Sequence, residues 1–318
     1  MTKHLLALAL FAITLAPNSA KAQETGTPTQ ALIAYSSKTP VTLTPANVTI
    51  KVDNRNVPVA SLAPIPANQA QIALLIDDGL RTSVGRELNN LRAFVTSLPQ
   101  GTEVFVGYMQ NGRVVPAGDL DGFTANHDAA AQGLRIPFGI PGASASPYFS
   151  LSDFVKNWPT PAEGQTAPQQ QFTHKARIVL MITNGVDPYN GSTSITNQDS
   201  PYVASAVTDA QRAGVPVYSI YFSDAGFRGG RGSFSGQSYL AQLAQGTGGI
   251  SFYQGSGNPV SLAPFLDQFK AAVAATYVAT FPVDGTKKLV SLKLSTTAPK
   301  AKLRGPDQIR PGTIVLAQ

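Results

Sequence analysis

The stretch that decides the fold is residues 72–78, which read Ile-Ala-Leu-Leu-Ile-Asp-Asp. Its continuous apolar run predicts a strand that is covered on both faces, as in a parallel sheet with helices on each side. Apolar side chains at helical spacing follow in residues 84–98. Two similar runs stand at 178–183 (IVLMIT) and 215–222 (VPVYSIYF). Apolar strands that alternate with amphipathic helices predict an α/β domain with a doubly wound, mostly parallel sheet over residues 71–276.

Shorter elements complete this pattern. Further strands are expected at 102–109, 112–116 and 250–253, the second of them antiparallel to the first. Helices are expected at 150–158, 202–213, 238–244 and 264–276. Because sheets of this kind bind ligands at the carboxyl ends of their strands, the loops that follow the strands are the candidate binding surface.

The segments on both sides of this domain are rich in β-strand patterns. Within residues 23–70, apolar and polar side chains alternate at 41–43, 48–52 and 57–59, before an expected linker at 63–70. Within residues 277–318, the alternation returns at 277–283 and 289–294. We expect the two ends of the chain to pair as a small β-sandwich, with the α/β domain inserted between them.

The first 22 residues have the layout of a cleavable export signal. Lys3 precedes an apolar run at 5–16, and Ala20-Lys21-Ala22 is a small-x-small cleavage pattern. The run is short for a membrane-spanning helix, which favours a cleaved signal over the alternative interpretation, an uncleaved anchor. No later stretch approaches the required apolar length. We expect a mature chain that starts at Gln23, has no transmembrane segment and resides in the periplasm or outside the cell.

The composition excludes several classes of function. The chain has no cysteine, which rules out disulfides, thiol nucleophiles, iron–sulfur clusters and cysteine-bound zinc, and three histidines are too few for a His-rich metal centre. The formal charge of +6 falls to +4 without the two lysines of the signal, and residues 284–310 hold seven cations against two acids. The remainder is nearly neutral, so we expect no nucleic-acid binding. The basic tail is interpreted as a solvated segment or as a weak contact for anionic envelope surfaces.

Four strings, in this order and spacing, resemble those of von Willebrand factor type A (VWA) domains, in particular the VWFA-related family found in acidobacteria. They are residues 72–78, 177–187 (RIVLMITNGVD), 210–221 (AQRAGVPVYSIY) and 243–249 (LAQGTGG). The strings at 107–112 and 146–153 fit that bacterial branch as well. The resemblance covers about residues 71–275 and implies a Rossmann-like sheet that binds its partner at the strand-top loops.

The resemblance also implies a metal-ion-dependent adhesion site in these loops. In that family the first loop reads Asp-x-Ser-x-Ser, the second supplies Thr or Ser, and the third supplies Asp, around a Mg²⁺ ion that prefers hard oxygen ligands. This chain keeps the first carboxylate as Asp77. Gly79 and Arg81 stand where the serines are expected, and Asn184 stands in place of the third-loop acid.

The second loop of the implied site falls near Ser144 or Ser146. With two hydroxyls and one carboxylate missing, we expect a degenerate site without a cofactor, in which the Arg81 guanidinium can pair with Asp77 in place of the metal. The alternative is that Mg²⁺, Mn²⁺ or Ca²⁺ is held by Asp77 with Asp187, or with Asp78, as substitute ligands. Neighbouring residues at a strand end point to opposite faces, so Asp77 and Asp78 should diverge and should not act as an acid–base pair.

No catalytic motif accompanies the predicted fold. No Gly-x-Ser-x-Gly elbow follows a strand, and His127 and His174 stand in polar segments and are interpreted as surface histidines. The Gly-rich residues 224–236 lack the Gly-Lys-Ser/Thr ending of a nucleotide-binding loop and are interpreted as a loop at the ligand-facing edge.

We therefore expect a protein that is not an enzyme but an exported binding module for adhesion or assembly. Its partner would be another protein or a surface polymer, recognised through loops at 77–83, 142–150, 184–200 and 224–236. The alternatives are a periplasmic enzyme or enzyme subunit that uses the same cleft, and a structural module whose site has decayed.

Overall fold

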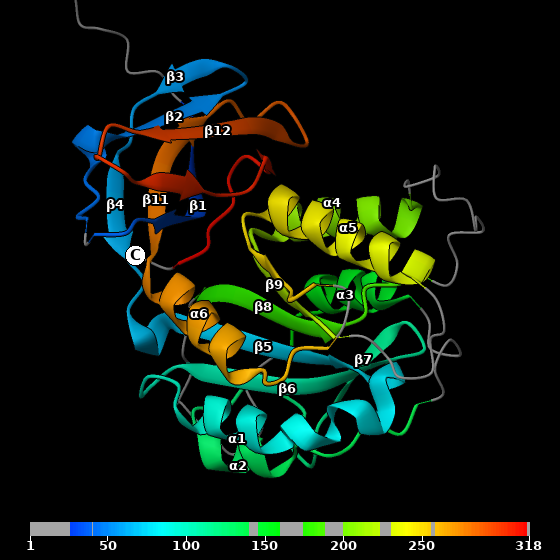
Figure 1. Cartoon of the computed structure of the whole chain (residues 1–318). Helices are drawn as coiled ribbons and strands as arrows, with labels where there is room; N and C mark the ends of the chain where they lie inside the picture. The colour runs from blue at the N-terminus through cyan, green and yellow to red at the C-terminus, as the bar shows by residue number, and fades with distance from the viewer. Residues whose placement is uncertain are drawn as a thin grey trace, which may run out of the picture.

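The computed structural model describes residues 26–39, 41–139, 146–159, 174–187, 200–222, 230–255 and 258–316, without the side chains of 81–83 and 230–234. The chain consists of a six-stranded sheet between helical layers, called here the central sheet, and a sandwich of two four-stranded sheets at one end of it. Figure 1 shows the sandwich above the central sheet and the helices on both faces of that sheet. The expected export signal and the polar segment 162–173 lie outside the described residues.

The central sheet has the strand order β10-β9-β8-β5-β6-β7. Its parallel strands are β5 (Ala70–Asp77), β6 (Glu103–Gln110), β8 (Ala176–Thr183), β9 (Val217–Tyr221) and β10 (Ser251–Phe252). β7 (Arg113–Pro116) is antiparallel to β6 at the edge. Because the chain crosses between strands that lie on both sides of β5, this order confirms the predicted doubly wound α/β fold.

Helices cover both faces of the central sheet. α1 (Leu88–Thr96), α2 (His127–Gln132) and α6 (Ala263–Ala274) share a core with Ile72, Leu74 and Ile76 of β5. α3 (Pro147–Lys156), α4 (Pro201–Ala213) and α5 (Gly230–Thr247) share a second core with Ala73 and Leu75 of the same strand. Burial on both faces is the reason that β5 has no polar alternation.

The sandwich pairs the two ends of the chain, as predicted. One sheet has the order β13-β1-β11-β4, and the other has the order β14-β12-β2-β3. Their strands are β1 (Thr27–Ser36), β2 (Val48–Val52), β3 (Arg55–Val57), β4 (Ser61–Pro64), β11 (Thr276–Val283), β12 (Val290–Thr296), β13 (Lys302–Arg304) and β14 (Gln308–Ile309). Ala31 is opposite Ala279, and Val52 is opposite Leu292, so each sheet joins an N-terminal strand to a C-terminal one.

Several expectations about the local structure were wrong. Residues 41–43 form no strand, β3 ends where a strand was expected to begin, and β4 includes the first two residues of the expected linker. β1 was not predicted because its buried residues include the polar Thr29 and Gln30, so its apolar run is only residues 31–34. Ile33 lies in the sandwich core, whereas Leu32 packs into a core of the central sheet. Residues 230–236 of the Gly-rich segment are helical, as the start of α5. In addition, the helix expected from residue 84 begins as a 3₁₀ helix, η3 (Asp78–Glu87).

None of the helices in the described parts of the chain is long and apolar enough to cross a membrane.

Candidate functional site

Asp77 is the last residue of β5, and its buried carboxylate ties two strands together. Its Oδ1 accepts a hydrogen bond from the backbone N–H of Gly79 at 2.9 Å. Its Oδ2 accepts one from the hydroxyl of Thr183, at the end of β8, at 2.7 Å. The Thr183 hydroxyl oxygen in turn accepts from the Gly185 N–H at 3.0 Å. Both oxygens of Asp77 are therefore used to hold the loops that follow β5 and β8.

Asp78 is also buried, but its carboxylate holds a different loop. Its Oδ1 accepts from the Phe138 backbone N–H at 3.1 Å and lies 3.5 Å from Nη1 of Arg135. The loop approaches so closely that a Cβ on Gly139 would lie 2.8 Å from Oδ2 of Asp78. The two neighbouring carboxylates thus take different partners, as their positions at a strand end predict.

Arg135 connects Asp78 to the protein surface. Its guanidinium lies 4.1 Å from the ring centre of Tyr108 and 4.6 Å from that of Phe138. The Tyr108 hydroxyl donates to the Arg135 carbonyl at 2.6 Å and accepts from the Arg135 N–H at 2.8 Å. Residues 135–139, called here the Phe138 loop, are consequently fixed by charge, by stacking and by backbone hydrogen bonds.

The loop after β8 is tied down by its own polar side chains. Oδ1 of Asn184 accepts from the Val186 N–H at 2.9 Å, which closes an Asx turn. The buried carboxylate of Asp187 accepts from the hydroxyl of Ser200, and Ser200 caps the N-terminus of α4. Asn184 and Asp187 therefore stabilise the path of the chain towards α4.

Tyr148 lies beneath this loop, in the first turn of α3. Its hydroxyl is fully buried and donates to the Gly185 carbonyl at 2.7 Å. Burial raises the pKa of Tyr148 well above its usual value, and the nearby charges of Asp187, first, and Asp77 raise it further. Tyr148 thus stays a neutral donor between the two acids of the predicted site.

The remaining predicted site residues are only partly described. Ser146 is buried directly before α3, and its hydroxyl has no hydrogen-bond partner within the described part of the chain. Arg81 lies in η3, but the pairing expected of its side chain falls outside what the structure describes. Ser144 and the parts of the candidate loops at 188–199 and 224–229 also lie outside the described residues.

The described oxygens do not fit the open octahedral shell of a Mg²⁺ ion. Both oxygens of Asp77, Oδ1 of Asn184 and one oxygen of Asp187 already accept hydrogen bonds from the protein. Within the ranges described above, no group of three or more His, Asp or Glu side chains is placed to hold a metal ion. A divalent ion would have to share these oxygens with the hydrogen bonds that they already accept, so the described residues offer no preformed octahedral shell.

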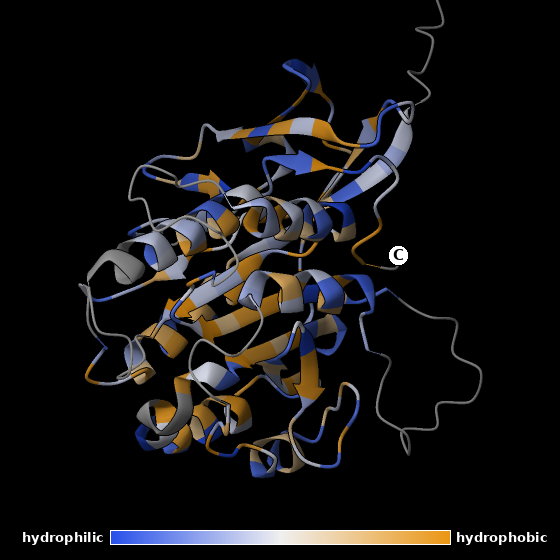
Figure 2. Ribbon diagram, turned by 90° about the vertical axis from the view of Figure 1, so that its right-hand side faces the viewer, coloured by the Kyte–Doolittle hydropathy of each residue, from blue (hydrophilic) through white to orange (hydrophobic). Residues whose placement is uncertain are grey.

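Hydrophobic side chains are exposed at the carboxyl edge of the central sheet, which is the edge that faces the viewer in Figure 2. Among the described residues, five of the seven exposed large hydrophobic side chains belong to loops or helix starts at this edge. They are Ile136 (40% exposed), Phe138 (76%), Phe149 (50%), Tyr253 (55%) and Val260 (90%). Exposed aromatic side chains gathered on one face are typical of binding surfaces.

Sequence reasoning missed Arg135, Phe138 and Tyr148. The signal that points to the first two is the string Leu-Arg-Ile-Pro-Phe-Gly-Ile-Pro at 134–141, in which apolar residues stand between prolines directly after a helix. Such a loop is stiff, because each proline fixes its own backbone φ angle and restricts the preceding residue.

The two histidines of the described chain lie far from this edge. Nε2 of His127 is 2.7 Å from the carbonyl oxygen of Thr102, directly before β6 begins. His174 lies two residues before the start of β8, so it too is at the amino edge of the central sheet. Neither imidazole is placed to act with Asp77 or Asp78.

The sequence matches no protein-family model and no curated protein. Solved structures that resemble the chain include a von Willebrand factor type A protein from Catenulispora acidiphila, at 12% identity and a TM-score of 0.45, covering 91% of this chain and 75% of that one. The pilus adhesin SpaC from Lactobacillus rhamnosus GG resembles it at 10% identity and a TM-score of 0.41, covering 86% and 47%. The VWA domain of SpRpn10 resembles it at 8% identity and a TM-score of 0.37, covering 63% and 95%.

These likenesses concern the fold alone, and the chain spans less than half of the adhesin's length. The strand order and the two helical layers of this chain by themselves confirm the doubly wound α/β fold that its sequence predicts.

Proposed function

We propose that the chain is an exported, non-catalytic binding module that recognises another protein or a surface polymer through the carboxyl edge of its central sheet. The observation that carries this proposal is the Phe138 side chain, which is 76% exposed on a loop that Asp78 and Arg135 hold in place. A large aromatic anchor on a fixed loop loses little conformational freedom on binding, so most of its buried area contributes to affinity.

The proposed recognition does not depend on a metal ion. The acids of the predicted adhesion site serve as internal hydrogen-bond acceptors, and their loops are held without a cation. A binding role is favoured over catalysis because the described histidines lie at the opposite edge of the sheet from Asp77. Adhesion or assembly in the cell envelope or outside the cell is the role that we propose for this surface.

The test of this function is a comparison of two exposed hydrophobic positions. The mature chain is immobilised, partners are captured from a cell-envelope fraction and identified by mass spectrometry, and the affinity of the purified pair is then measured. Phe138→Ala should weaken the affinity by about tenfold or more, as for an aromatic interface anchor. Val115→Ala is the matched control, because Val115 is exposed on β7 outside this group of loops. Equal affinities of wild type and Phe138→Ala would refute recognition through the Phe138 loop.

Export is tested separately. We expect the protein recovered from the periplasm or the medium to begin at Gln23 when its N-terminus is sequenced. A chain recovered with Met1 in the cytoplasm would contradict this part of the proposal and leave the binding measurement standing.

A further inference from the structure

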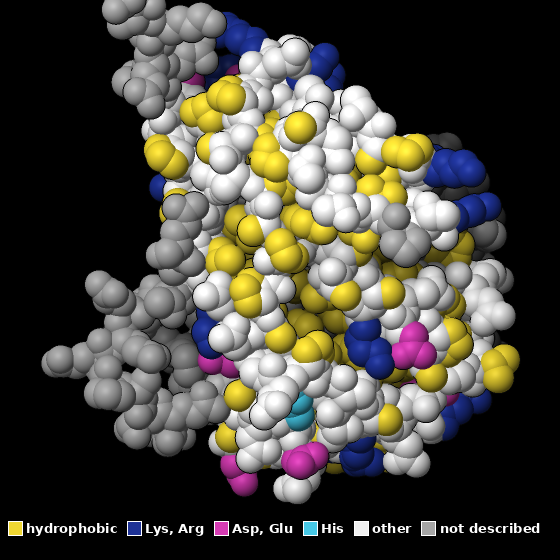
Figure 3. All heavy atoms as spheres, turned by 90° about the vertical axis from the view of Figure 1, so that its left-hand side faces the viewer, with side chains coloured by type: hydrophobic (Ala, Val, Ile, Leu, Met, Phe, Trp, Pro, Cys, Tyr) yellow, Lys and Arg dark blue, Asp and Glu magenta, His cyan; other side chains and the backbone are white. Residues whose placement is uncertain are grey.

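A pocket with a markedly basic lining lies at the amino edge of the central sheet, away from the proposed recognition surface. Its volume is about 360 Å³, within the range of small-molecule sites. Its basic lining residues are His174, Lys175, Arg177, Arg212 and Arg310, and none of the described residues that line it is acidic. Such a concentration of basic side chains is unusual in this chain, because only 13% of all residues are charged and most of the surface seen in Figure 3 is uncharged.

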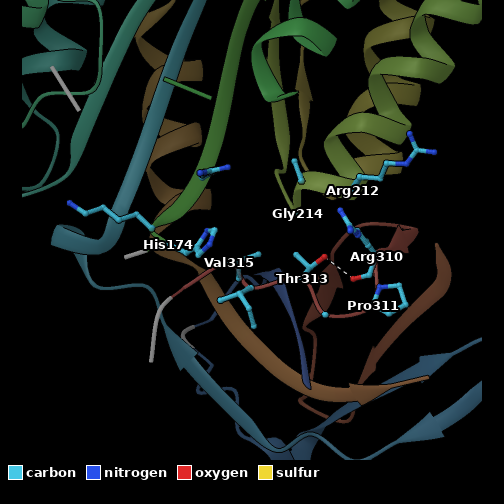
Figure 4. A pocket seen from close by; sticks show the side chains of 12 residues that line it. His174, Arg212, Gly214, Arg310, Pro311, Thr313 and Val315 are labelled. Carbon is cyan, nitrogen blue, oxygen red and sulfur yellow. Dashed lines mark hydrogen bonds between the residues drawn. The ribbon is translucent and has the colours of Figure 1, made fainter. Parts of the chain in front are cut away.

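Three segments that are distant in sequence form this pocket. Residues 174–177 lead into β8, residues 212–214 form the turn between α4 and β9, and residues 310–315 come from the C-terminal segment. Figure 4 shows His174 and Arg310 on opposite sides, with Thr313 and Val315 between them. The pocket therefore exists only where the sandwich segment reaches the α/β domain.

The walls of the pocket are fixed by the protein itself. The buried side chain of Gln30 accepts hydrogen bonds from the backbone N–H groups of Val315 and Leu316, at 3.0 and 2.9 Å. The Thr313 hydroxyl donates to the Arg310 carbonyl at 2.7 Å. Gly214 packs so tightly that a Cβ there would lie 2.8 Å from Val315. Arg310 thus stands on a backbone that is already ordered, which reduces the entropy cost of binding.

Two of the cations have acidic partners outside the pocket. Nζ of Lys175 lies 2.5 Å from Oε1 of Glu103, and Nη1 of Arg212 lies 3.5 Å from Oδ1 of Asp209. In Figure 4 the Arg212 guanidinium extends away from Arg310. These two side chains therefore bring partly neutralised charge to the rim.

The other two arginines are not neutralised by any residue that the structure describes. Arg177 lies over the ring of Trp158, 5.2 Å from its centre, and its buried Nε has no hydrogen-bond acceptor among the described residues. Its burial lowers the pKa of Arg177, which reflects the cost of desolvating the cation. Arg310 is exposed and has no ion pair with any described acid. A buried donor without an acceptor and an uncompensated cation both favour an anion from outside the chain.

We propose that this pocket binds a phosphate-type oxyanion, either as the free ion or as the phosphate group of a small molecule or lipid. Two uncompensated guanidinium groups match the charge of a phosphate dianion, and each can donate paired hydrogen bonds to its oxygens. This site is separate from the proposed recognition surface, so either proposal can fail without the other.

Calorimetry with inorganic phosphate at low ionic strength tests the proposal on the mature chain. We expect saturable binding of one ion per chain, competition by sulfate but not by chloride, and affinity about tenfold weaker in Arg310→Gln. Arg113→Gln is the matched control, because Arg113 is an exposed arginine of β7 outside the pocket; its affinity should stay within about twofold of wild type. Circular dichroism establishes that Arg177→Gln, the second pocket variant, is folded before it is used.

Vesicles of phosphatidylcholine, with and without phosphatidic acid, identify the source of the phosphate group. Co-sedimentation that requires phosphatidic acid and Arg310 indicates a lipid headgroup, whereas phosphate binding without co-sedimentation indicates a soluble ligand. The proposal is overturned if wild type shows no saturable phosphate binding, if Arg310→Gln binds as well as wild type, or if Arg113→Gln loses as much affinity as Arg310→Gln.

Discussion

At the carboxyl edge of the central sheet, the buried carboxylates of Asp77, Asp78 and Asp187 all accept hydrogen bonds from the protein. At the amino edge, the guanidinium groups of Arg177 and Arg310 have no described acid to neutralise them. Charge that is satisfied inside the chain fixes the shape of a surface, whereas charge without an internal partner is available to a ligand. The acids that the sequence marks most strongly thus hold the loops of the carboxyl edge in place. At the amino edge, Arg310 of the basic tail contributes a charge that is left for a ligand.

The largest effect should come from Asp77→Ala, which leaves the Thr183 hydroxyl and the Gly79 N–H without their acceptor in a buried site. We expect the free energy of unfolding to fall by about 3 kcal/mol in urea denaturation. Asp121→Ala, at an exposed acid, should change it by less than about 0.5 kcal/mol. An unchanged stability of Asp77→Ala would mean that this carboxylate is kept for a ligand, and the contrast between the two edges would disappear.

Tyr148→Phe should have the next largest effect, because the buried Gly185 carbonyl then loses its donor. We expect a loss of about 1–2 kcal/mol at neutral pH in the same measurement. Tyr253→Phe, at an exposed tyrosine, is the matched control and should leave stability unchanged.

Tyr148 also predicts a pH dependence. Because its pKa is raised in the folded state, the folded chain keeps a proton that the unfolded chain releases, so stability declines as the pH rises above about 10, the usual tyrosine value. Tyr148→Phe should remove up to about 1.4 kcal/mol per pH unit from this decline. The variant would still lose stability at alkaline pH through Tyr108 and Tyr218, whose pKa values are also raised by burial. An unchanged alkaline slope would show that Tyr148 is not the neutral buried donor described here.

An effect of similar size should distinguish a partnered arginine from an unpartnered one. Arg135→Gln removes the ion pair with Asp78 and the contacts with two rings, so we expect a loss of about 1–2 kcal/mol. Arg310→Gln, measured in phosphate-free buffer, should change stability by less than about 0.5 kcal/mol. Chemical denaturation of both variants sharpens the comparison, and a large loss in Arg310→Gln would reveal a structural role for that cation.

The smallest expected effect is that of divalent metals. Titration of the chelator-treated mature chain with Mg²⁺, Mn²⁺ or Ca²⁺ should give no saturable heat, because the oxygens of the predicted site accept internal hydrogen bonds. The double variant Arg81→Ser, Asn184→Asp restores the ligand types of the resembling family and should gain Mg²⁺ binding. Binding of one ion per wild-type chain that is lost in Asp77→Ala would refute the metal-free proposal.

Most of the central sheet was predictable because its signal is local. β5, β8 and β9 are covered on both faces, so most of their residues are apolar without a regular alternation, and that can be seen in a window of a few residues. Asp77 was identified through the resemblance to the first loop of the adhesion site, and its place at the end of such a strand puts it at the binding edge. The local signal failed for β1, because the buried polar residues Thr29 and Gln30 leave it an apolar run of only residues 31–34.

The sequence alone determined the α/β architecture, the position of Asp77 and the divergence of its neighbour, because apolar periodicity and strand ends are properties of adjacent residues. Only the tertiary structure decided that Arg135 meets Asp78 and that Arg310 and Arg177 line one pocket. These pairs join segments that are far apart along the chain, and their approach is set by the packing of whole strands and helices. No short-range pattern encodes such a contact, so the charges that hold a loop and the charges left for a ligand are distinguished only in the folded protein.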